Sequence, residues 1–593
     1  MQAVKWYLSF LKKYRVLMVV GLILTMVISG LSMINPSISG TIVDQVIEGG
    51  NRSLLGKLIA CLIGVTVING SLRFLQQVLF EKASQGMLYS MRDAVFRKFL
   101  AEDFSFYNRK RTGDLMSRQT GDMDAIRHFT AYVIYAIIQN MLLFILALLM
   151  IFTVNVKLAL LMIVVLPFTA YTTYHQMKRI RPAFQRNRNC FSSLNAFVQE
   201  NVSGNRVVKA FASEDYEITK FMLENDKFRD AQIASSKVWM KHVPFFDIFS
   251  HSLTIILMLY GGYLVINGSI TMGDLVKVNS YLWMLNMPLR MAGWWVNDVQ
   301  NFSTSVDKVY GTFTEEPEIK SPRIGEYTKL RGEVEFRGVS YRAQDADIVT
   351  NINFKVRAGS TVGIIGSTGS GKSTLMNLLC RFYDTTAGEI LVDGIDIRQM
   401  DLYNLRDNIG MAMQDVFLFS DTIEGNIAYG RPDCTFEEVK HAAIIADANH
   451  FIKELSDGYD TIVGERGVGL SGGQKQRISL ARALLKDPSI LILDDTTSAV
   501  DMETESYIQK QLKAIQQEKD CTVFIIAYRI SSIKDADLIL VLDGGQIIEQ
   551  GTHDSLVEKN GYYAQAFRNQ YGEVPYDLLE EASHAQEVTN GTQ

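Results

Sequence analysis

The sequence predicts two domains of different class: an α-helical membrane domain with six transmembrane helices, followed by an α/β domain. Six long apolar runs occupy the first half of the chain, and after about residue 302 short β-branched runs alternate with amphipathic helical patterns. A glycine-rich loop between a predicted strand and a predicted helix marks the second part as a phosphate-binding domain. We expect a membrane domain over 1–320, an α/β domain over 321–570 and an acidic, disordered tail over 571–593.

The composition agrees with a membrane protein and excludes other classes. Of the 593 residues, 48% are hydrophobic, which is high for a soluble protein. The net charge of -5 is small for this length, so we expect no nucleic-acid partner. The five cysteines lie far apart and form no CxxC pair, which argues against a zinc site or a disulfide framework.

The apolar runs each come near or above the roughly 20 residues that cross a bilayer. They lie at 16–38, 54–80, 130–153, 157–175, 243–267 and 275–300. The two long connections, 81–127 and 176–241, are dense in Lys and Arg, which places them and both termini in the cytoplasm. Their apolar residues recur at helical spacing, so we expect the membrane helices to continue below the bilayer rather than end in solvated loops.

The strongest motif is GSTGSGKST, which follows the strand-like STVGII and opens a helical pattern. Its GxxxxGK[ST] spacing predicts a loop whose backbone N–H groups bind the phosphates of ATP, with Lys372 on the β and γ phosphates and Ser373 on Mg²⁺. The candidate nucleotide-binding residues are Gly366, Ser367, Thr368, Gly369, Ser370, Gly371, Lys372, Ser373 and Thr374.

Two adjacent carboxylates end the hydrophobic run ILILDD. A buried strand that delivers an acid beside a phosphate loop is typical of a nucleotide site, so Asp494 is expected to be the magnesium carboxylate. Asp495 is then placed to meet the attacking water. Together with the phosphate loop, the pair predicts a site for Mg-ATP.

The segment LSGGQKQR, which precedes these acids, resembles the signature of ABC ATPases, with Ser471 and Gly473 as its candidate functional residues. The chain is identified as a member of the six-helix ABC exporter half-transporters, a resemblance that covers nearly everything except the tail. It implies that Tyr341 stacks on adenine and that Gln414 senses magnesium and the membrane domain. The alternatives are that Tyr341 is an ordinary sheet aromatic and Gln414 a solvated loop residue.

The same resemblance implies further roles. The loop around Glu465 would face the coupling helices, and Asp501 would act across a dimer. The segments 106–126 and 200–217 are similar to the two cytoplasmic loops of that family, whose short coupling helices dock on the nucleotide domains.

Two residues depart from the family pattern at one nucleotide site. The family has glutamate at Asp495 as general base, and an aspartate carboxylate is withdrawn by about 1.5 Å, so proton transfer loses hydrogen-bond reach. The family has histidine at Tyr528 to orient the water, and a phenol cannot reproduce the two-sided hydrogen bonding of imidazole. We expect Mg-ATP binding with impaired hydrolysis; the alternative is that both substitutions are harmless.

These observations imply a heterodimer. The intact signature would serve the nucleotide of a second half-transporter, which supplies the hydrolysing site, so the chain resembles the degenerate-site subunit of bacterial heterodimeric multidrug-type exporters. We expect an integral protein of a bacterial cell membrane, in contact with lipid and with its nucleotide domain in the cytoplasm, that exports an amphipathic drug, lipid or peptide. The alternatives are a homodimeric exporter with slow ATPase, or a regulatory or channel-like ABC protein.

Polar and aromatic residues near the sixth run are candidates for a substrate path, because polar groups at membrane depth usually face a cavity. Helix packing or an interfacial position explains them equally well. They are Trp294, Trp295, Asn297 and Asp298, together with Arg290 and Asp247. His553 is expected to be structural.

Overall fold

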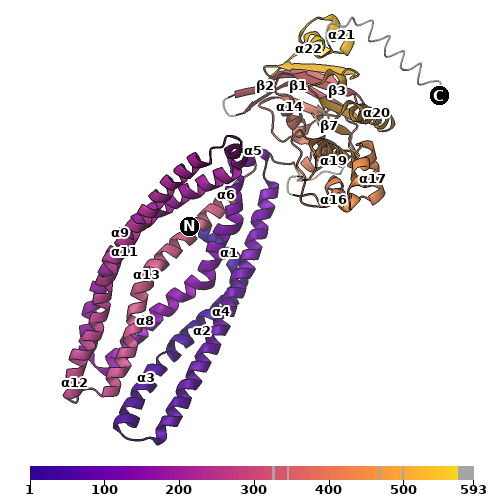
Figure 1. The fold of residues 1–593 in the computed structure, drawn as a ribbon. Coiled ribbons are helices and arrows are strands. Elements are labelled where there is room, and N and C mark those ends of the chain that lie inside the picture. Colours follow the sequence, from indigo (N-terminus) through magenta and orange to yellow (C-terminus); the bar gives the residue numbers. More distant parts are fainter. Residues whose placement is uncertain (323–327, 344–345, 465–466, 468, 497–499, 572–593) are drawn as a thin grey trace. The chain divides into compact units, whose positions relative to one another are not determined.

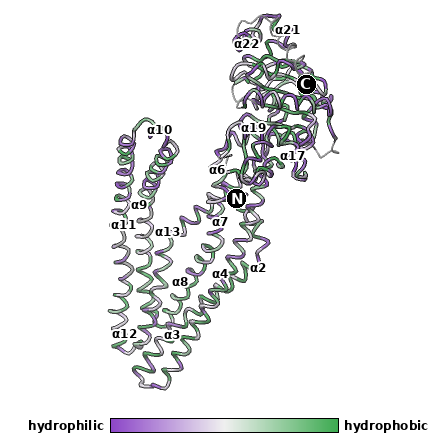
Figure 2. The backbone as a smooth tube through the Cα atoms, turned by 45° about the vertical axis from the view of Figure 1, so that its right-hand side comes forward, coloured by the Kyte–Doolittle hydropathy of each residue, from purple (hydrophilic) through white to green (hydrophobic). Residues whose placement is uncertain are grey.

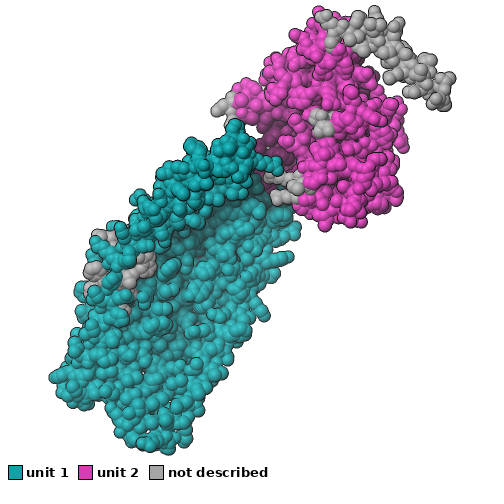
Figure 3. All heavy atoms as spheres, viewed as in Figure 1, with its two compact units in different colours: residues 1–102, 110–316 teal, residues 103–109, 317–593 magenta. Residues whose placement is uncertain are grey.

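The computed structural model describes residues 1–322, 328–343, 346–464, 467, 469–496 and 500–571 (Figure 1). The chain divides into two compact units, shown in teal and magenta in Figure 3. Unit 1 comprises Met1–Glu102 and Lys110–Glu316, and unit 2 comprises Asp103–Arg109 and Pro317–Gln593. The seven residues Asp103–Arg109 therefore group with the second unit, although they come from the first predicted cytoplasmic connection.

Unit 1 is built from helices. They are α1 (Gln2–Leu11), α2 (Arg15–Leu31), α3 (Ile34–Thr41), α4 (Ser53–Ala101), α6 (Thr112–Ser117), α7 (Met123–His128), α8 (Ile134–Val154), α9 (Val156–Ser203), α10 (Asn205–Ala210), α11 (Glu214–Ile256), α12 (Gly262–Ile266) and α13 (Met272–Thr314). In Figure 1, α9 and α11 run side by side as a long hairpin joined through α10.

Four of these helices are much longer than a bilayer is thick. Helices α4, α9, α11 and α13 contain 49, 48, 43 and 43 residues. At 1.5 Å per residue even α11 extends ~65 Å, against a hydrocarbon core of ~30 Å. Figure 2 shows hydrophilic colouring on the ends of α9 and α11 next to α10. The prediction that helices continue beyond the membrane is confirmed.

Several predicted crossings meet simple criteria of length and composition. Among the described residues, the helical stretches long and apolar enough to cross a membrane are Gln2–Glu48, Ser53–Ala101 and Thr112–Val154. Two shorter apolar helices, Val156–Thr172 and His251–Ile266, coincide with the fourth and fifth predicted crossings. The sixth predicted crossing lies inside α13, which is not among these candidate stretches, and it stays a prediction.

The helices of unit 1 pack through an apolar core and one close backbone approach. Buried side chains from α8, α9, α11 and α13 form one cluster, which includes Ala147, Ile151, Leu158, Leu253 and Tyr281. Gly273 at the start of α13 lies against the carbonyl oxygen of Gly40 in α3, so closely that a Cβ at Gly273 would overlap it. Next to this crossing the Asp44 carboxylate accepts hydrogen bonds from the N–H of Gly273 (2.7 Å) and the hydroxyl of Thr271 (2.8 Å).

Unit 2 is an α/β structure. Its strands are β1 (Val334–Ala343), β2 (Ala346–Val356), β3 (Thr361–Gly366), β4 (Ala387–Val392), β5 (Ile395–Asp396), β6 (Ile409–Ala412), β7 (Ile490–Asp494), β8 (Thr522–Ile526), β9 (Leu538–Asp543) and β10 (Gln546–Gly551). Its helices are α5 (Phe104–Arg109), α14 (Lys372–Leu379), α15 (Leu402–Asp407), α16 (Ile423–Ala428), α17 (Phe436–Ile445), α18 (Asn449–Glu454), α19 (Gly472–Leu485), α20 (Met502–Lys519), α21 (His553–Glu558) and α22 (Tyr562–Tyr571).

The strands form two sheets rather than one. A six-stranded sheet has the order β10-β9-β3-β8-β7-β6 and is parallel except for its β10–β9 edge. A second sheet, β2-β1-β4-β5, is antiparallel. Most of the segment EVEFRGVSY lies in β1 of the antiparallel sheet. Its alternating burial fits a sheet with one covered face, whereas β7 is buried throughout.

The core of unit 2 lies where α14 packs against both sheets. Leu375, Met376 and Leu379 of α14 are fully buried. They belong to one cluster with Phe336 of β1 and Phe524 of β8. This packing fixes the first turn of α14, and hence the loop that precedes it, relative to the ends of the parallel strands.

Helix α5 packs on residues of unit 2. The Phe104 ring stacks on Phe382 with centroids 4.4 Å apart, and the Asn108 amide donates a hydrogen bond to the Tyr383 hydroxyl (2.9 Å). The Asp103 carboxylate accepts the N–H of Ile319 (3.3 Å). Burial acts to raise the pKa of Asp103, but hydrogen bonds from Ser105 and from backbone N–H groups outweigh it and lower the pKa.

Candidate nucleotide-binding site

Four of the predicted site residues follow parallel strands of the six-stranded sheet. Gly366 ends β3 and Asp494 ends β7, while Gln414 and Tyr528 come two residues after β6 and β8. Because the carboxyl ends of parallel strands lie at one edge of a sheet, these residues gather at the same edge. The order β3-β8-β7-β6 places Tyr528 and Asp494 between the phosphate loop and Gln414.

The phosphate loop has the backbone that its glycines predict. Gly369 and Gly371 have φ of +82° and +95°, in the region that favours glycine. Gly371 also lies against β2: a Cβ there would be 2.7 Å from Cγ1 of Val349 and 3.1 Å from the carbonyl oxygen of Ile348. The loop thus turns tightly between two sheets and enters α14 at Lys372.

Lys372 is buried at the centre of this loop. Its ammonium group donates hydrogen bonds to the carbonyl oxygens of Gly366 (2.9 Å) and Ser367 (2.8 Å), which curl the loop around it. Burial lowers the pKa of Lys372, and the nearby carboxylates of Asp494 and Asp495 partly oppose that shift. A buried ammonium group that can exchange its hydrogen bonds to the backbone for hydrogen bonds to a ligand is well suited to bind an anion.

A hydroxyl and a carboxylate lie together beside the lysine. The Ser373 hydroxyl donates a hydrogen bond to the Asp494 carboxylate. Burial raises the pKa of Asp494, and the negative charges of Asp495 and Asp415 add to that shift, while Ser373 and Lys372 lower it. A carboxylate that is desolvated and faces two others favours a cation as neighbour.

The residues present fit a magnesium nucleotide. The hydroxyl of Ser370 is buried and makes no hydrogen bond within the described residues, so it is available to a phosphate oxygen at the loop. Ser373 and Asp494 are oxygen ligands of the kind that Mg²⁺ takes alongside phosphate and water. The described part of the chain contains no group of three or more His, Cys, Asp or Glu side chains that could hold a metal by themselves.

The two divergent residues lie in this same site. Asp495 has a left-handed backbone (φ +50°), and its N–H donates to the carbonyl oxygen of Ile526 at the end of β8 (3.0 Å). The Tyr528 ring lies over Lys372, with the ammonium nitrogen 4.8 Å from the ring centre. The structure thus brings Asp495, Tyr528 and the phosphate loop together, as the sequence predicted.

Tyr341 lies one strand away from the loop. It is on β1, paired with Val349 of β2, and Val349 is the residue that Gly371 contacts. Its ring is partly buried, and the centroids of the Tyr341 and Tyr383 rings are 5.3 Å apart. Burial raises the pKa of the Tyr341 hydroxyl. This placement beside the phosphate loop suits an adenine-stacking aromatic, and the role stays a prediction.

The signature residues are on a different helix. Ser471 is the N-cap of α19: its hydroxyl accepts the N–H of Gln474 (3.3 Å), and the Gln474 side chain accepts the N–H of Ser471 (2.8 Å). Gly473 is buried in the first turn. That these residues act on a nucleotide bound by another chain stays a prediction.

The remaining candidates have mixed outcomes. Gln414 is exposed in the segment that follows β6. Asp501 is the N-cap of α20, where it accepts the N–H of Thr504 (2.9 Å), and its role across a dimer stays a prediction.

Glu465 lies outside the described residues, as does the predicted tail beyond Tyr571. His553 makes a 2.7 Å hydrogen bond with the buried Tyr563 hydroxyl, as expected of a structural residue.

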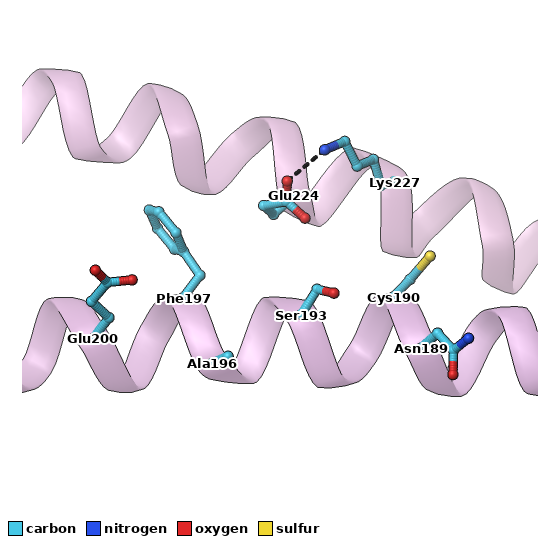
Figure 4. A pocket seen from close by; sticks show the side chains of 8 residues that line it. All are labelled: Asn189, Cys190, Ser193, Ala196, Phe197, Glu200, Glu224 and Lys227. Carbon is cyan, nitrogen blue, oxygen red and sulfur yellow. Dashed lines mark hydrogen bonds and ion pairs between the residues drawn. The ribbon is translucent and has the colours of Figure 1, made fainter. Parts of the chain in front are cut away.

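The candidates in the membrane unit divide by exposure. Trp295 is buried, whereas Trp294 is 60% exposed. Arg290 of α13 lies 4.0 Å from Asp247 of α11, so these two residues pair with each other. A groove of about 590 Å³ between α9 and α11 contains the ion pair Glu224–Lys227 (Figure 4). This groove belongs to unit 1, whereas the nucleotide-site residues belong to unit 2.

Two glutamines at the site were not predicted. Gln476 of α19 donates a hydrogen bond to the carbonyl oxygen of Asp495 (3.2 Å), and Gln570 of α22 donates one to the carbonyl oxygen of Tyr528 (2.7 Å). The only signal for Gln476 was its position two residues beyond the LSGGQ segment. Nothing in the local sequence marks Gln570.

Both units match known families. Residues 18–289 match the ABC transporter transmembrane region, and residues 349–498 match the ABC transporter family. The chain is 39% identical over 564 residues to an uncharacterized ABC transporter ATP-binding protein, YknU, of Bacillus subtilis (strain 168), covering 95% of this chain and 96% of that protein.

Further relatives are similar over nearly their whole length. A putative multidrug export ATP-binding/permease protein, YgaD, of Bacillus subtilis (strain 168) is 34% identical, with 96% of this chain and 99% of that protein covered. An ATP-dependent lipid A-core flippase of Syntrophus aciditrophicus (strain SB) is also 34% identical, with 95% of this chain and 92% of that protein covered.

A solved structure shares the architecture. The ATP-bound structure of a bacterial Atm1-family ABC exporter superposes with a TM-score of 0.79 at 30% identity, covering 94% of this chain and 98% of that one. The chain therefore belongs to the ABC exporter family, as a membrane-embedded half-transporter in which a helical transmembrane domain is fused to an ATPase domain.

Proposed function

We propose that this chain is the degenerate-site subunit of a heterodimeric ABC exporter. It binds Mg-ATP at its own phosphate loop, hydrolyses that nucleotide slowly, and presents its LSGGQ segment to the nucleotide of a different half-transporter. The observation that carries the proposal is the combination of Asp495 and Tyr528 at one site whose binding residues are intact. A homodimer would contain two impaired sites, so the hydrolysing site must come from a partner.

The nucleotide-binding residues of the site support the proposal that this chain binds Mg-ATP. Lys372 holds the β and γ phosphates, the Ser370 hydroxyl and the loop N–H groups meet further phosphate oxygens, and Tyr341 stacks on adenine. Ser373 and Asp494 hold Mg²⁺, which supplies neutralisation of the phosphate charge when bound. Gln414 lies at the same strand edge, where it can sense the occupied site.

The catalytic half of the site is weakened in two ways. The Asp495 carboxylate is one methylene shorter than a glutamate, and its backbone is tied to Ile526 and Gln476, so it cannot advance without breaking those hydrogen bonds. The Tyr528 ring covers Lys372 instead of presenting an imidazole nitrogen to the attacking water. A poorly placed base and an unoriented water lower the rate together, because they act on the same proton transfer.

The cargo that we propose is an amphipathic molecule, such as a drug, a lipid or a peptide, taken from the inner leaflet or the cytoplasm. The names of two relatives, a putative multidrug exporter and a lipid A-core flippase, support an amphipathic class. The membrane helices also leave many large apolar side chains on the surface of the isolated chain, where lipid, the partner or cargo can cover them.

The test compares this chain alone with the chain co-expressed with candidate half-transporters. ATPase turnover should require the partner, and Asp495→Ala should leave turnover of the complex within about twofold, because the proposed hydrolysing base is elsewhere. Lys372→Ala is the comparison for lost nucleotide binding in this chain. Full turnover by the chain alone, or loss of turnover in Asp495→Ala equal to removal of the partner's base, would disprove the proposal.

A further inference from the structure

The C-terminal helix α22 reaches the loop that carries Tyr528. The Gln570 amide nitrogen donates to the carbonyl oxygen of Tyr528 (2.7 Å), and the Gln570 amide oxygen accepts the N–H of Ile530 (2.9 Å). One carboxamide therefore satisfies both a backbone acceptor and a backbone donor of the same loop. Only one orientation of the amide can make both bonds, so the geometry is specific to glutamine at this position.

Helix α22 is itself held at its opposite end. The Glu549 carboxylate of β10 accepts the N–H groups of Tyr562 (2.6 Å) and Tyr563 (3.1 Å), which would otherwise lack partners at the start of the helix. The Tyr563 side chain is fully buried and its hydroxyl bonds to His553. Because these contacts fix the helix, Gln570 is presented to the loop from a rigid support.

The loop connects this support to the nucleotide site. Tyr528 is 41% exposed, and its ring lies over the Lys372 ammonium group at 4.8 Å. Farther along the loop, Ser532 donates a hydrogen bond to the buried carboxylate of Glu505, and Arg529 lies 3.4 Å from the same carboxylate. Gln570 holds the backbone of Tyr528 itself through the hydrogen bond to its carbonyl oxygen.

We propose that Gln570 is a positioning residue for nucleotide retention: from the C-terminal helix it holds the Tyr528 loop so that the ring covers Lys372. A ring over the phosphate-loop lysine encloses a bound triphosphate and restricts its exit. If nothing held the loop, each binding event would have to order it. The conformational entropy lost in ordering the loop would then reduce the affinity for nucleotide. The inference rests on the proposed function only in treating this site as one that retains nucleotide.

The experiment measures Mg–AMP-PNP binding to the full-length chain in its purified transporter complex. Displacement of a photoreactive azido-ATP, scored as label on this chain, reports its own phosphate loop and needs no hydrolysis. Gln570→Met keeps the side-chain length but removes both hydrogen bonds, and should weaken binding by roughly three- to tenfold. Gln565→Met, an exposed glutamine on the same helix, is the matched control and should bind as the unaltered protein does.

Two further variants separate positioning from folding. Gln570→Glu keeps an acceptor for the Ile530 N–H, so it should weaken binding less than Gln570→Met. In a Tyr528→Ala background, Gln570→Met should have no further effect, because Gln570 acts through the ring. Thermal unfolding of each variant, set beside Gln565→Met, identifies any general loss of structure.

The inference is overturned if Gln570→Met binds nucleotide as Gln565→Met does, or if its full effect persists without the Tyr528 ring. Failure of the proposed function looks different: phosphate release would depend on Asp495, whatever the affinity for AMP-PNP. The two outcomes are therefore read in separate measurements.

Discussion

The ammonium nitrogen of Lys372 lies 4.8 Å from the centre of the Tyr528 ring, at the edge of the sheet where nucleotide is expected. The interaction of a cation with an aromatic face contributes about 0.5–1 kcal/mol at a partly exposed site. In the proposed function the lysine contacts phosphates, so this interaction belongs to nucleotide binding and adds nothing to activation of water. We therefore expect Tyr528 to favour retention of ATP over its hydrolysis.

Restoring hydrolysis should need two changes together. Asp495→Glu returns the reach of the base but leaves the water unoriented, and Tyr528→His does the reverse, so each alone should recover little turnover. The double variant should exceed the sum of the singles, because base and orienter act on one proton transfer. Phosphate release is measured in a complex whose partner lacks its own base, so any turnover comes from this chain. Equal recovery in Asp495→Glu alone would contradict a role for Tyr528.

The signature can be tested with its helix cap preserved. Aspartate and asparagine both cap helices about as well as serine, so Ser471→Asp and Ser471→Asn should keep α19 intact. Only the aspartate places a negative charge where the partner's nucleotide phosphates would bind. Turnover of the complex should be at least about tenfold lower in Ser471→Asp than in Ser471→Asn. Similar turnover in the two variants would argue that this signature does not face a nucleotide.

The phosphate loop offers a matched pair of glycine substitutions. Gly369→Ala and Gly371→Ala both place a side chain in the left-handed region, at about 1 kcal/mol each. Only at Gly371 does the added Cβ meet Val349 and the Ile348 carbonyl, whereas nothing lies within 4 Å at Gly369. Gly371→Ala should therefore lose more thermal stability and more azido-ATP labelling. A larger loss at Gly369 would show that contact with β2 does not set the shape of the loop.

Membership of the exporter family predicts the direction of transport, which can be measured in membrane vesicles. Inside-out vesicles that contain the complex expose the nucleotide domains to the medium, so added ATP should drive accumulation of an amphipathic cargo in the lumen. The same vesicles with Lys372→Ala test whether nucleotide at this chain's site is needed. Loss of preloaded cargo from the lumen on addition of ATP would contradict export.

Much of this protein could be predicted from contiguous sequence. The phosphate loop, the acids Asp494 and Asp495, and the LSGGQ segment are each encoded within a few neighbouring residues, and the apolar runs are long enough to indicate a membrane domain. The structure places Asp494 and Tyr528 near this loop, at the same edge of the parallel strands. The antiparallel sheet was missed, because a short β-branched run carries no information about the direction of its partner strand.

The tertiary structure alone decided the contacts between residues that are far apart in the sequence and that no local pattern connects. Gln570 lies 42 residues after Tyr528, and the aromatic contact of Phe104 with Phe382 joins a segment between the membrane helices to the ATPase unit. Such pairs arise when whole elements pack, and an exposed glutamine on a terminal helix looks like any other solvated residue until the fold brings a loop to it. The sequence by itself determined the chemistry of the nucleotide site. The packing of α22 and α19 decided how Tyr528 and Asp495 are held there, because the hydrogen bonds to their backbone come from helices that are distant in the chain.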